Sequence, residues 1–483
     1  MNLNEWFLLF LSFNLIIFGG SYKLFKLAGV EGWKSLIPIY NIVKHLDIIN
    51  RPRWWAILVF IPVINLLMIP VIWIEFIKTF NHNSKLDRLL VIFTLGFYIY
   101  YISYLSSKTK YIGKISFSNF EKSIGSFIWA IVFATIVHNY ILQPFVIPTG
   151  SLEKTLRVGD FLLVSKFHYG ARIPSTVLSF PMVHDTIPII KSRSYLNKPQ
   201  LPYLRIPGFQ EIKNNDIVVF NWPADTVRKF FVKEKGVIKP RDKKSNYVKR
   251  AIGIPGDTLE IKDGVIYLNG IENILPDRAK PLFTYLIKSN KGVSSSKLIN
   301  LEIDGFIRKF IISNLSNDSY TEISKYILNI SNTKENEYVV YTYDKGIPID
   351  VVREYGLDIR EIIDNKKELN LTYLDAVKIK NSNEFDTIYR LTEKINVSNS
   401  NFFPNNKRFT WNNDQLGPLY IPRAGDKIDL TISLLPLYKK IITDYEYNEL
   451  SVVEGDILIN GKVEQEYIFK QDYYWMMGDN RYN

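Results

Sequence analysis

The sequence predicts a membrane-anchored protein whose soluble part is mainly β. Apolar residues crowd into the first 147 positions, whereas short β-branched and aromatic runs bounded by turn residues are typical of the positions after them. A third observation is a long polar stretch that interrupts these runs. The predicted order is an N-terminal membrane region with about three transmembrane helices (1–126), a last transmembrane helix (127–147), a β-barrel or sheet core in two parts (148–270 and 411–483) and an α+β insertion (271–410).

The composition excludes several functions. The chain has 483 residues, with 60 Lys and Arg against 48 Asp and Glu, so its formal net charge is +12. Cysteine is absent, which excludes thiolate zinc sites, iron–sulfur clusters, thiol nucleophiles and disulfides. No His, Asp or Glu cluster has metal-ligand spacing, so we expect no metal and no cofactor. The basic residues are scattered without an aromatic stripe, so we expect no nucleic-acid partner.

Four apolar runs predict the membrane region. About 20 apolar residues are needed to cross a bilayer, and Trp54–Ile74 and Phe127–Ile147 reach that length. Trp6–Phe18 and Leu89–Leu105 are shorter, and each is either a span or a buried or interfacial helix. The lipid bilayer is therefore an expected partner.

Loop charges predict the orientation of these spans. The first and third loops carry six and four basic residues, whereas the N-terminus carries none and the second loop three. Because loops rich in Lys and Arg stay in the cytoplasm, the N-terminus and everything after Ile147 should be extracytoplasmic.

Strand and turn signals predict the soluble core. Asp160–Lys166 and Asp216–Phe220 have strand length and composition. Asp263-Gly264 and Asn460-Gly461 separate pairs of such runs, and these dipeptides supply the positive φ angles that two-residue hairpin turns need. The sequence therefore predicts at least two hairpins in the core.

The polar stretch 271–410 predicts a separate α+β insertion. It is rich in Asn, Ser, Lys and Glu, and it contains the helix-like pieces Ile349–Tyr355 and Leu374–Lys380. Its residues carry few chemical signals, so its role is open.

A serine and a lysine are the candidate catalytic residues. Ser151 follows Pro148-Thr149-Gly150 at the end of the last apolar run, where turn chemistry alone is the simpler explanation. Lys249 changes this interpretation, because apolar residues such as Val248 and Ile252 alternate around it, and burial among them would lower its pKa. A neutral lysine can act as a general base, and a hydroxyl nucleophile needs such a base.

Four segments, taken in order, resemble the bacterial type I signal peptidase (leader peptidase) family of membrane-bound Ser/Lys endopeptidases. Pro148–Ser151 matches the nucleophile block, Lys249–Asp257 the Lys-Arg-x-x-Gly-x-Pro-Gly-Asp block, and Gly478–Arg481 the Gly-Asp-Asn-Arg block. The strand Asn215–Phe220 matches a further block. The resemblance implies a β-barrel-like catalytic core, with Ser151 as nucleophile and Lys249 as general base.

The resemblance also implies roles for further residues. The oxyanion hole would be formed by the Ser151 N–H and the Thr149 hydroxyl, and Arg250 and Asp479 would form an ion pair that supports the Lys249 strand. The substrates would be signal-peptide-bearing preproteins with small residues at the first and third positions before the cut. The residues expected on the substrate-binding wall, for each of which ordinary core packing is an equal alternative, are Phe145, Ile147, Pro148, Leu152, Leu156, Val219 and Val248.

The expected protein is a multi-pass enzyme of the bacterial plasma (inner) membrane, with its catalytic region on the extracytoplasmic side. One alternative is a non-catalytic, membrane-tethered binding protein on the same scaffold. Another is a self-cleaving Ser/Lys repressor peptidase, which the four spans and the absence of a DNA-binding motif disfavour. A triad of Ser151, His168 and Asp160 is a weak rival, since His168 lies in a strand-like run without an orienting motif.

The sequence departs from the family pattern in its extra spans before Ser106, in its long polar insertion after Gly270, near the nucleophile and at its end. Leu152 stands where the family usually has Met, and Lys154 where it often has Pro. The chain stops at Asn483, whereas the family continues with a Ser, an Asp and an Arg that support the lysine. We therefore expect this form to be C-terminally incomplete and weakly active or inactive, and restoring roughly 20–40 residues, the length of two or three strands, should return activity.

Overall fold

The computed structural model describes residues 3–113, 116–224, 237–334, 337–399 and 401–482. The chain divides into two compact units. The first comprises Met1–Phe145, Phe161–Glu211 and Val219–Tyr247, and the second comprises Val146–Asp160, Ile212–Val218 and Val248–Asn483.

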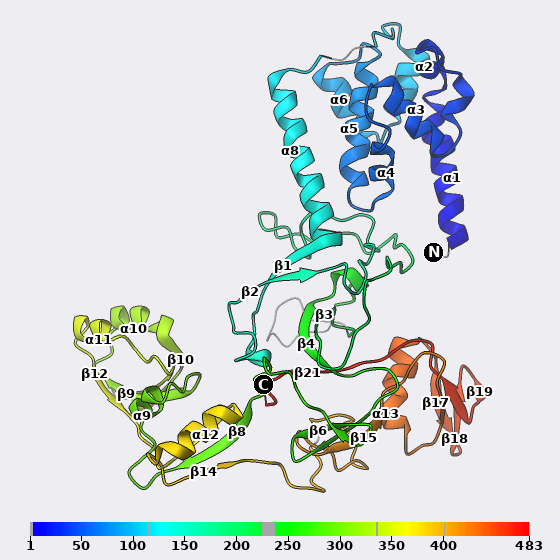
Figure 1. The fold of residues 1–483 in the computed structure, drawn as a ribbon. Helices are drawn as coiled ribbons and strands as arrows, with labels where there is room; N and C mark the ends of the chain where they lie inside the picture. Colours follow the sequence, from blue (N-terminus) through cyan, green and yellow to red (C-terminus); the bar gives the residue numbers. More distant parts are fainter. Residues whose placement is uncertain (1–2, 114–115, 225–236, 335–336, 400, 483) are drawn as a thin grey trace. The chain divides into compact units, whose positions relative to one another are not determined.

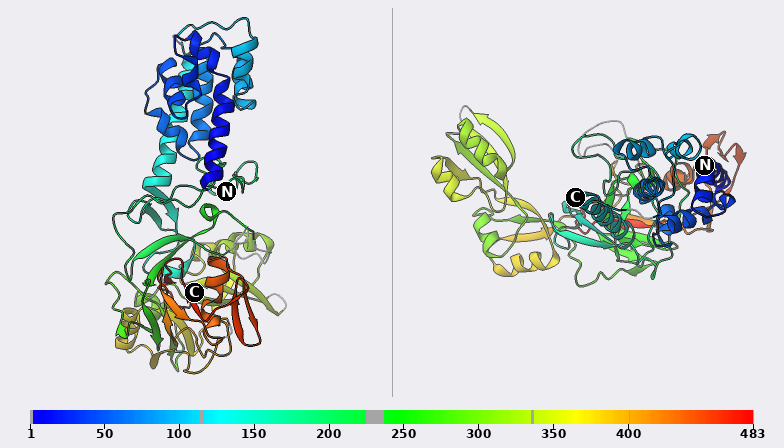
Figure 2. Two further views of the ribbon diagram at one scale, coloured as in Figure 1. Left: turned by 90° about the vertical axis from the view of Figure 1, so that its right-hand side faces the viewer. Right: turned by 90° about the horizontal axis from the view of Figure 1, so that it is seen from above.

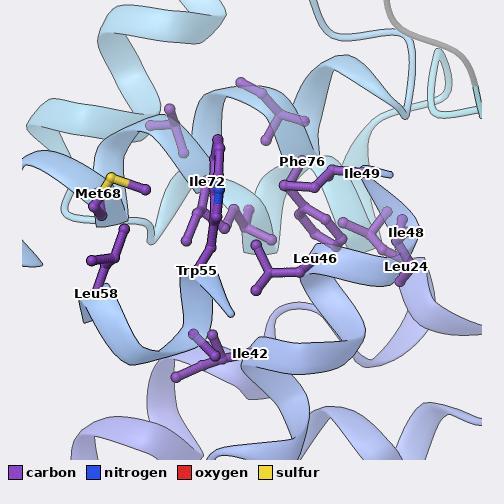
Figure 3. Packing of buried hydrophobic residues seen from close by; sticks show 14 of the residues in the cluster. Leu24, Ile42, Leu46, Ile48, Ile49, Trp55, Leu58, Met68, Ile72 and Phe76 are labelled. Atoms are coloured by element: carbon purple, nitrogen blue, oxygen red, sulfur yellow. The ribbon is translucent and has the colours of Figure 1, made fainter. Parts of the chain in front are cut away.

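The first unit begins with a group of helices that lie side by side in both Figure 1 and Figure 2. Their shared core is apolar and aromatic, and Figure 3 shows Leu46, Trp55 and Phe76 converging within it. The helices are α1 (Leu3–Gly19), α2 (Tyr22–Leu27), α3 (Tyr40–Ile48), α4 (Trp55–Phe60), α5 (Asn65–Lys78), α6 (Lys85–Phe93), α7 (Tyr98–Tyr100) and α8 (Asn119–Ile136).

In the described residues, one of the four predicted spans forms a helix long enough to cross a membrane, whereas Trp6–Phe18 lies in the continuous but shorter α1, which has 17 residues. α8 continues through the π-helical turn η3 (Val137–Ile141), and the resulting 23-residue helix Asn119–Ile141, with a mean hydropathy of 1.6, is long and apolar enough to cross a membrane. The last residues of the predicted fourth span instead form strand β1 (Leu142–Val146). A multi-pass arrangement therefore stays a prediction.

Backbone geometry explains why two predicted spans are broken. In Trp54–Ile74, Ile61 is extended before Pro62 and Val63 has a φ of 71°, so α4 ends and α5 starts anew. In Leu89–Leu105, Leu95 and Gly96 both have positive φ angles, which end α6. Hydrophobicity alone did not reveal these interruptions.

The β part of the first unit follows α8. Strand β1 pairs with β2 (Phe161–Ser165), and a long irregular excursion follows before β3 (Ile217–Asn221). β3 and β4 (Asn246–Gly253) both run across the boundary between the units.

Small antiparallel sheets form the core of the second unit. Both predicted hairpins are confirmed. Asp263-Gly264 joins β5 (Thr258–Lys262) to β6 (Val265–Leu268), and Asn460-Gly461 joins β18 (Asp456–Ile459) to β19 (Lys462–Val463). All four turn residues have positive φ angles. The other elements around the buried cluster that contains Ile252, Leu259 and Phe469 are β7 (Ile271–Glu272), β15 (Leu416–Tyr420), β16 (Lys427–Asp429), α13 (Leu435–Lys440), β17 (Leu450–Val453), β20 (Glu466–Ile468) and β21 (Trp475–Met477).

The stretch 271–410 contains helices and two antiparallel sheets, each with its own apolar core. The first sheet, called the outer sheet because its strands flank the other sheet in the sequence, has the order β13-β8-β14. Its strands are β8 (Phe283–Lys288), β13 (Lys366–Leu371) and β14 (Thr387–Arg390), and it packs with α9 (Ser295–Asn300) and α12 (Tyr373–Ser382). The inner sheet lies between β8 and β13 in the sequence and has the order β10-β11-β9-β12. Its strands are β9 (Ile307–Ser313), β10 (Ile327–Lys334), β11 (Glu337–Tyr343) and β12 (Asp358–Glu361), and it packs with α10 (Asn317–Ile323) and α11 (Ile349–Glu354).

The two helix-like pieces predicted in this stretch are confirmed as α11 and α12. The mainly β prediction for the chain holds only in part, since strands make up about a quarter of the residues and helices about a third. The excess of helix lies in the N-terminal group and in the insertion.

Candidate active site

The candidate nucleophile lies on a tight turn after β1. Thr149 is extended, with φ −136° and ψ 153°, and Gly150–Leu152 then form a single 3₁₀ turn that carries Ser151. The loop is held at its base, because the Ile147 N–H donates to the Asp160 oxygen at 3.0 Å and the Gly159 N–H to the Ile147 oxygen at 2.9 Å. Ser151 is buried, with 8% of its surface exposed, so its hydroxyl is largely shielded from bulk water.

Lys249 reaches this serine from β4. Its Nζ is hydrogen-bonded to Ser151 Oγ. Burial lowers the pKa of Lys249 from its ordinary value, because an ammonium group loses hydration in this environment. Ser151 and Lys249 both belong to the second unit, so one body holds the pair.

The residue after Lys249 fixes the position of β4. Arg250 Nε and Nη2 donate to the two carboxylate oxygens of Asp479, at 2.8 and 2.6 Å, and both side chains are buried. Arg250 Nη1 also donates to the Asn215 backbone oxygen at 2.8 Å. Burial alone would raise the pKa of Asp479, but the hydrogen bonds from Arg250 and Thr155 outweigh it and the pKa is lowered.

Thr155 connects this ion pair to the loop of the nucleophile. Its Oγ1 donates to Asp479 Oδ2 at 2.6 Å and accepts from the Lys280 N–H at 2.9 Å. The Leu282 N–H donates to the Asp479 backbone oxygen at 2.8 Å. The segment that contains Lys280 and Leu282, just before β8, is therefore bonded to Thr155 and Asp479, the residues that support β4.

Asn480 holds the serine turn directly. Its backbone N–H donates to the Ser151 oxygen and its Nδ2 to the Gly150 oxygen, both at 3.1 Å. Gly478 makes this approach possible, because a Cβ there would lie 2.3 Å from the Ser151 oxygen. Sequence reasoning noticed the Gly-Asp-Asn-Arg block only as part of a resemblance and assigned no role to Asn480 or Thr155.

The residues expected on a substrate wall have different environments. Pro148 is exposed, and Leu156 and Val248 are half-buried. Ile147 and Leu152 are 3% and 1% exposed, which favours the alternative of core packing for these two. Phe145 and Val219 belong to the first unit, and the ring of Phe145 contacts Lys166 there.

The two departures near the nucleophile have a structural basis. Lys154 has a φ of 70°, which a proline cannot adopt, and its Nζ forms an ion pair with Asp304 in the insertion. Leu152 fills a fully buried position, which any apolar side chain of this size satisfies.

The residues of the rival triad have other partners. His168 Nδ1 is hydrogen-bonded to Ser165 Oγ at 2.5 Å, and Asp160 accepts the Arg157 N–H at 2.7 Å. The hydrogen bond of the Ser151 hydroxyl that the structure records is the one with Lys249.

Comparisons with known proteins relate part of the chain to signal peptidases. Residues 121–298 match a family described as signal peptidase, peptidase S26, and residues 33–114 match a family of unknown function. A signal peptidase I of Rickettsia massiliae is 32% identical over 145 residues, which are 30% of this chain and 41% of that protein. A signal peptidase I of Pseudomonas aeruginosa is 32% identical over 187 residues, 38% of this chain and 50% of that protein. No solved structure matches.

Residues 121–298 thus resemble the signal peptidases of the peptidase S26 family. The relatives named signal peptidase I are bacterial, and the resemblance to the bacterial type I signal peptidases is confirmed. The chain spans half or less of the length of these two relatives.

Proposed function

We propose that the chain is an integral-membrane serine endopeptidase that removes N-terminal signal peptides from exported preproteins by means of a Ser151/Lys249 dyad. The observation that carries the proposal is the hydrogen bond between Lys249 Nζ and Ser151 Oγ on a buried turn. The lowered pKa of Lys249 adds support, because only the neutral amine can accept a proton.

The reaction would proceed in two stages. Ser151 Oγ attacks the scissile carbonyl carbon while its proton passes to Lys249 Nζ. The resulting ammonium then gives this proton to the leaving amine, the peptide C–N bond breaks, and the signal peptide remains as an acyl ester on Ser151. A water molecule, deprotonated by the same amine, attacks the ester and regenerates the serine hydroxyl.

The negative charge on the attacked oxygen needs preorganised donors, and one such donor contributes about 3 kcal/mol. The Ser151 N–H and the Thr149 hydroxyl are the proposed donors, by resemblance to the family. Asn480 supports the first of these, because its two hydrogen bonds to the Gly150 and Ser151 oxygens fix the peptide planes of the turn.

The proposed substrate-binding residues are the accessible members of the expected wall near Ser151: Pro148, Leu156 and Val248. A shallow apolar surface excludes large side chains by steric conflict, which fits a preference for small residues before the cut. Ile147 and Leu152 would act from beneath, by supporting this surface.

The proposed location is the bacterial plasma membrane, with several spans and an extracytoplasmic catalytic region. The helix Asn119–Ile141 supports one span, and it leads within ten residues to Ser151. The remaining spans are proposed from the apolar runs and the loop charges.

Cleavage of a membrane-reconstituted preprotein tests the proposal. The wild-type chain, Ser151→Ala, Lys249→Ala and Lys249→Arg are compared under single-turnover conditions, and we expect all three variants to be inactive. The arginine fails because a guanidinium cannot lose its proton at usable pH.

Two control variants separate chemistry from folding. Ser289→Ala removes another buried serine of the second unit, and Lys262→Ala removes an exposed lysine of the same unit, and both should cleave normally. Cleavage by Ser151→Ala or Lys249→Ala at the rate of the wild-type chain contradicts the proposal.

A further inference from the structure

The segment 150–157, called the nucleophile loop here, contacts the insertion at two separate points. The first is the stem of the insertion, where the Lys280 N–H donates to Thr155 Oγ1 at 2.9 Å. The second is Asp304, whose Oδ1 forms an ion pair with the Nζ of Lys154. All of these residues belong to the second unit, so one body contains both contacts.

Carboxylates from several parts of the insertion surround the ammonium group of Lys154. Asp304 lies between α9 and β9, where the chain passes from the outer to the inner sheet, Asp344 follows β11, and Asp375 lies in the first turn of α12. Burial lowers the pKa of Lys154, and the charges of Asp375 and Asp344 oppose this shift. Oδ1 of Asp304 is buried and has no other hydrogen-bond partner in the part of the chain that the structure describes. Arg157 Nη2 lies 3.8 Å from the other oxygen of Asp304, so one carboxylate binds two cations of the nucleophile loop.

The backbone at Lys154 has a conformation that needs support. Its φ angle is 70°, in the left-handed region that residues other than glycine rarely adopt. Such conformations persist where surrounding contacts hold them, and they are frequent near active sites. The ion pair with Asp304 is a contact of this kind, because it binds the end of the side chain to a body outside the loop. Without that contact, Lys154 can leave the left-handed region and extend into water.

Backbone hydrogen bonds connect Lys154 to the turn that carries the nucleophile. On one side of it, the Glu153 N–H donates to the Gly150 oxygen at 3.0 Å. On the other side, the Leu156 N–H donates to the Leu152 oxygen at 2.7 Å. The two acceptors are the first and last residues of the 3₁₀ turn. A change of the backbone at Lys154 therefore moves the peptide groups that hold both ends of this turn.

We propose that Asp304 is a positioning residue for cleavage, which holds Lys154 and thereby fixes the turn that presents the Ser151 hydroxyl to Lys249. The inference rests on the proposed Ser/Lys dyad and extends it, because it gives the insertion a part in the chemical step. In this role Asp304 acts through Lys154 and not on the substrate. Loss of the ion pair lowers the rate of the chemical step without unfolding the chain, since the contacts of the stem remain.

Steady-state cleavage of a preprotein by the full chain is the first test. Asp304→Asn and Lys154→Met each remove one charge of the pair. Glu302→Gln is the matched control, because it removes a nearby exposed carboxylate that pairs with Lys378 instead. We expect kcat to fall about fivefold in the first two variants, with KM and the thermal unfolding midpoint unchanged, and no change in the control.

Two further variants identify the ion pair as the cause. The double variant Lys154→Met, Asp304→Asn should be no slower than either single variant, because one substitution already removes the interaction. Lys154→Arg keeps the charge and should cleave at close to the wild-type rate. A wild-type kcat in Asp304→Asn, additive losses in the double variant, or a lower unfolding midpoint as the only change overturns the proposal.

A second readout does not depend on cleavage. The chain contains no cysteine, so Ser151→Cys introduces a single thiol whose pKa is measured from the pH dependence of its alkylation by iodoacetamide. A neighbouring lysine lowers the pKa of a thiol, so Lys249→Met in this background gives the full upward shift. We expect Asp304→Asn to raise the thiol pKa part of the way to that value, because the turn moves away from Lys249, and Glu302→Gln to leave it unchanged.

The thiol measurement separates the two proposals. A thiol pKa that Asp304→Asn leaves at its starting value overturns the positioning role, whether or not the dyad cleaves. A thiol pKa that Lys249→Met leaves unchanged overturns the dyad and the positioning role with it. A shift with Asp304→Asn supports the positioning role even if Ser151→Ala and Lys249→Ala cleave preprotein normally, a result that would overturn the proposed function alone.

Discussion

The backbone N–H of Asn480 donates to the backbone oxygen of Ser151 at 3.1 Å, although the two residues come from opposite ends of the soluble part of the chain. The side chain of Asn480 repeats the contact one residue earlier, at the Gly150 oxygen. A nucleophile on a three-residue turn has few backbone bonds of its own. Its geometry therefore depends on a segment that follows the whole insertion in the chain.

Asn480 should affect the chemical step more than substrate binding. Asn480→Asp keeps the size of the side chain but removes the donor to Gly150, and one such hydrogen bond is worth about 1 kcal/mol, or about fivefold in kcat. We expect kcat to fall by about that factor and KM to change little. Asn412→Asp, at a buried asparagine that donates to the Lys394 and Val397 oxygens, is the matched control and should leave kcat unchanged. A pure loss of stability with normal kcat would make Asn480 merely structural.

Thr155 should contribute to stability through its hydroxyl. Thr155→Val removes the donor to Asp479 and the acceptor for the Lys280 N–H, and each unsatisfied buried group costs about 1–3 kcal/mol. Thr155→Ser should restore most of the loss. The measurement is the thermal unfolding midpoint in detergent micelles, with Thr284→Val, at a half-buried threonine whose hydroxyl makes a solvent-exposed hydrogen bond to Asn370, as control. Equal midpoints for Thr155→Val and Thr155→Ser would refute this role.

The pH dependence of cleavage should report Lys249. Its pKa is lowered from 10.5 by burial, and the neutral amine is the base. We therefore expect kcat/KM to rise with pH, with an apparent pKa below 10.5. The same shift makes stability rise with pH between the lowered and the ordinary pKa, because the unfolded chain binds the extra proton. A profile that rises only above 10.5 would contradict the environment assigned to Lys249.

Asp479 should make the protein sensitive to acid. Its pKa is lowered in the folded state, so the ion pair contributes stability above the ordinary carboxyl value of 3.8, and this is lost as pH falls through the lowered pKa. Asp479→Asn leaves Arg250 buried without its charge partner, which costs about 3–5 kcal/mol at neutral pH. The double variant Arg250→Met, Asp479→Leu should be less destabilised than the single one. The free energy of unfolding, measured with denaturant at neutral and acidic pH, checks both statements. An equal loss of this free energy in the single and the double variant would contradict them.

Membrane topology can be mapped with fused reporters. A reporter after Lys108 should be cytoplasmic and one after Asn381 extracytoplasmic, because the first and third loops carry six and four basic residues against none and three in the N-terminus and second loop. A cytoplasmic signal at Asn381 would put Ser151 on the wrong side for exported substrates.

Local signals in the sequence were sufficient for some elements and not for others. Asp263-Gly264 and Asn460-Gly461 predict their hairpins because a two-residue turn is decided by the φ angles of its own residues. Pro62 interrupts the apolar run Trp54–Ile74 in the sequence, but hydropathy averages over a single proline and does not predict that the run divides into α4 and α5 there. The bond from Thr155 to Asp479 had no local signal, since it joins segments that only the complete fold brings together.

The bonds of Lys280 and Leu282 also bear on how this chain can be shortened. The strand that leaves them, β8, pairs with β14, and the Leu391 N–H returns to the Thr284 oxygen at 2.8 Å. The two stems of the insertion are therefore neighbours, and a short glycine-rich linker from residue 283 to residue 391 can replace everything between them with little loop-closure cost. A deletion that begins at residue 271, where the polar composition starts, would instead remove the peptide groups that brace Thr155 and Asp479. A shortened chain therefore has to keep residues 271–282 and begin its deletion at β8 of the outer sheet, twelve residues after the point where the polar composition starts.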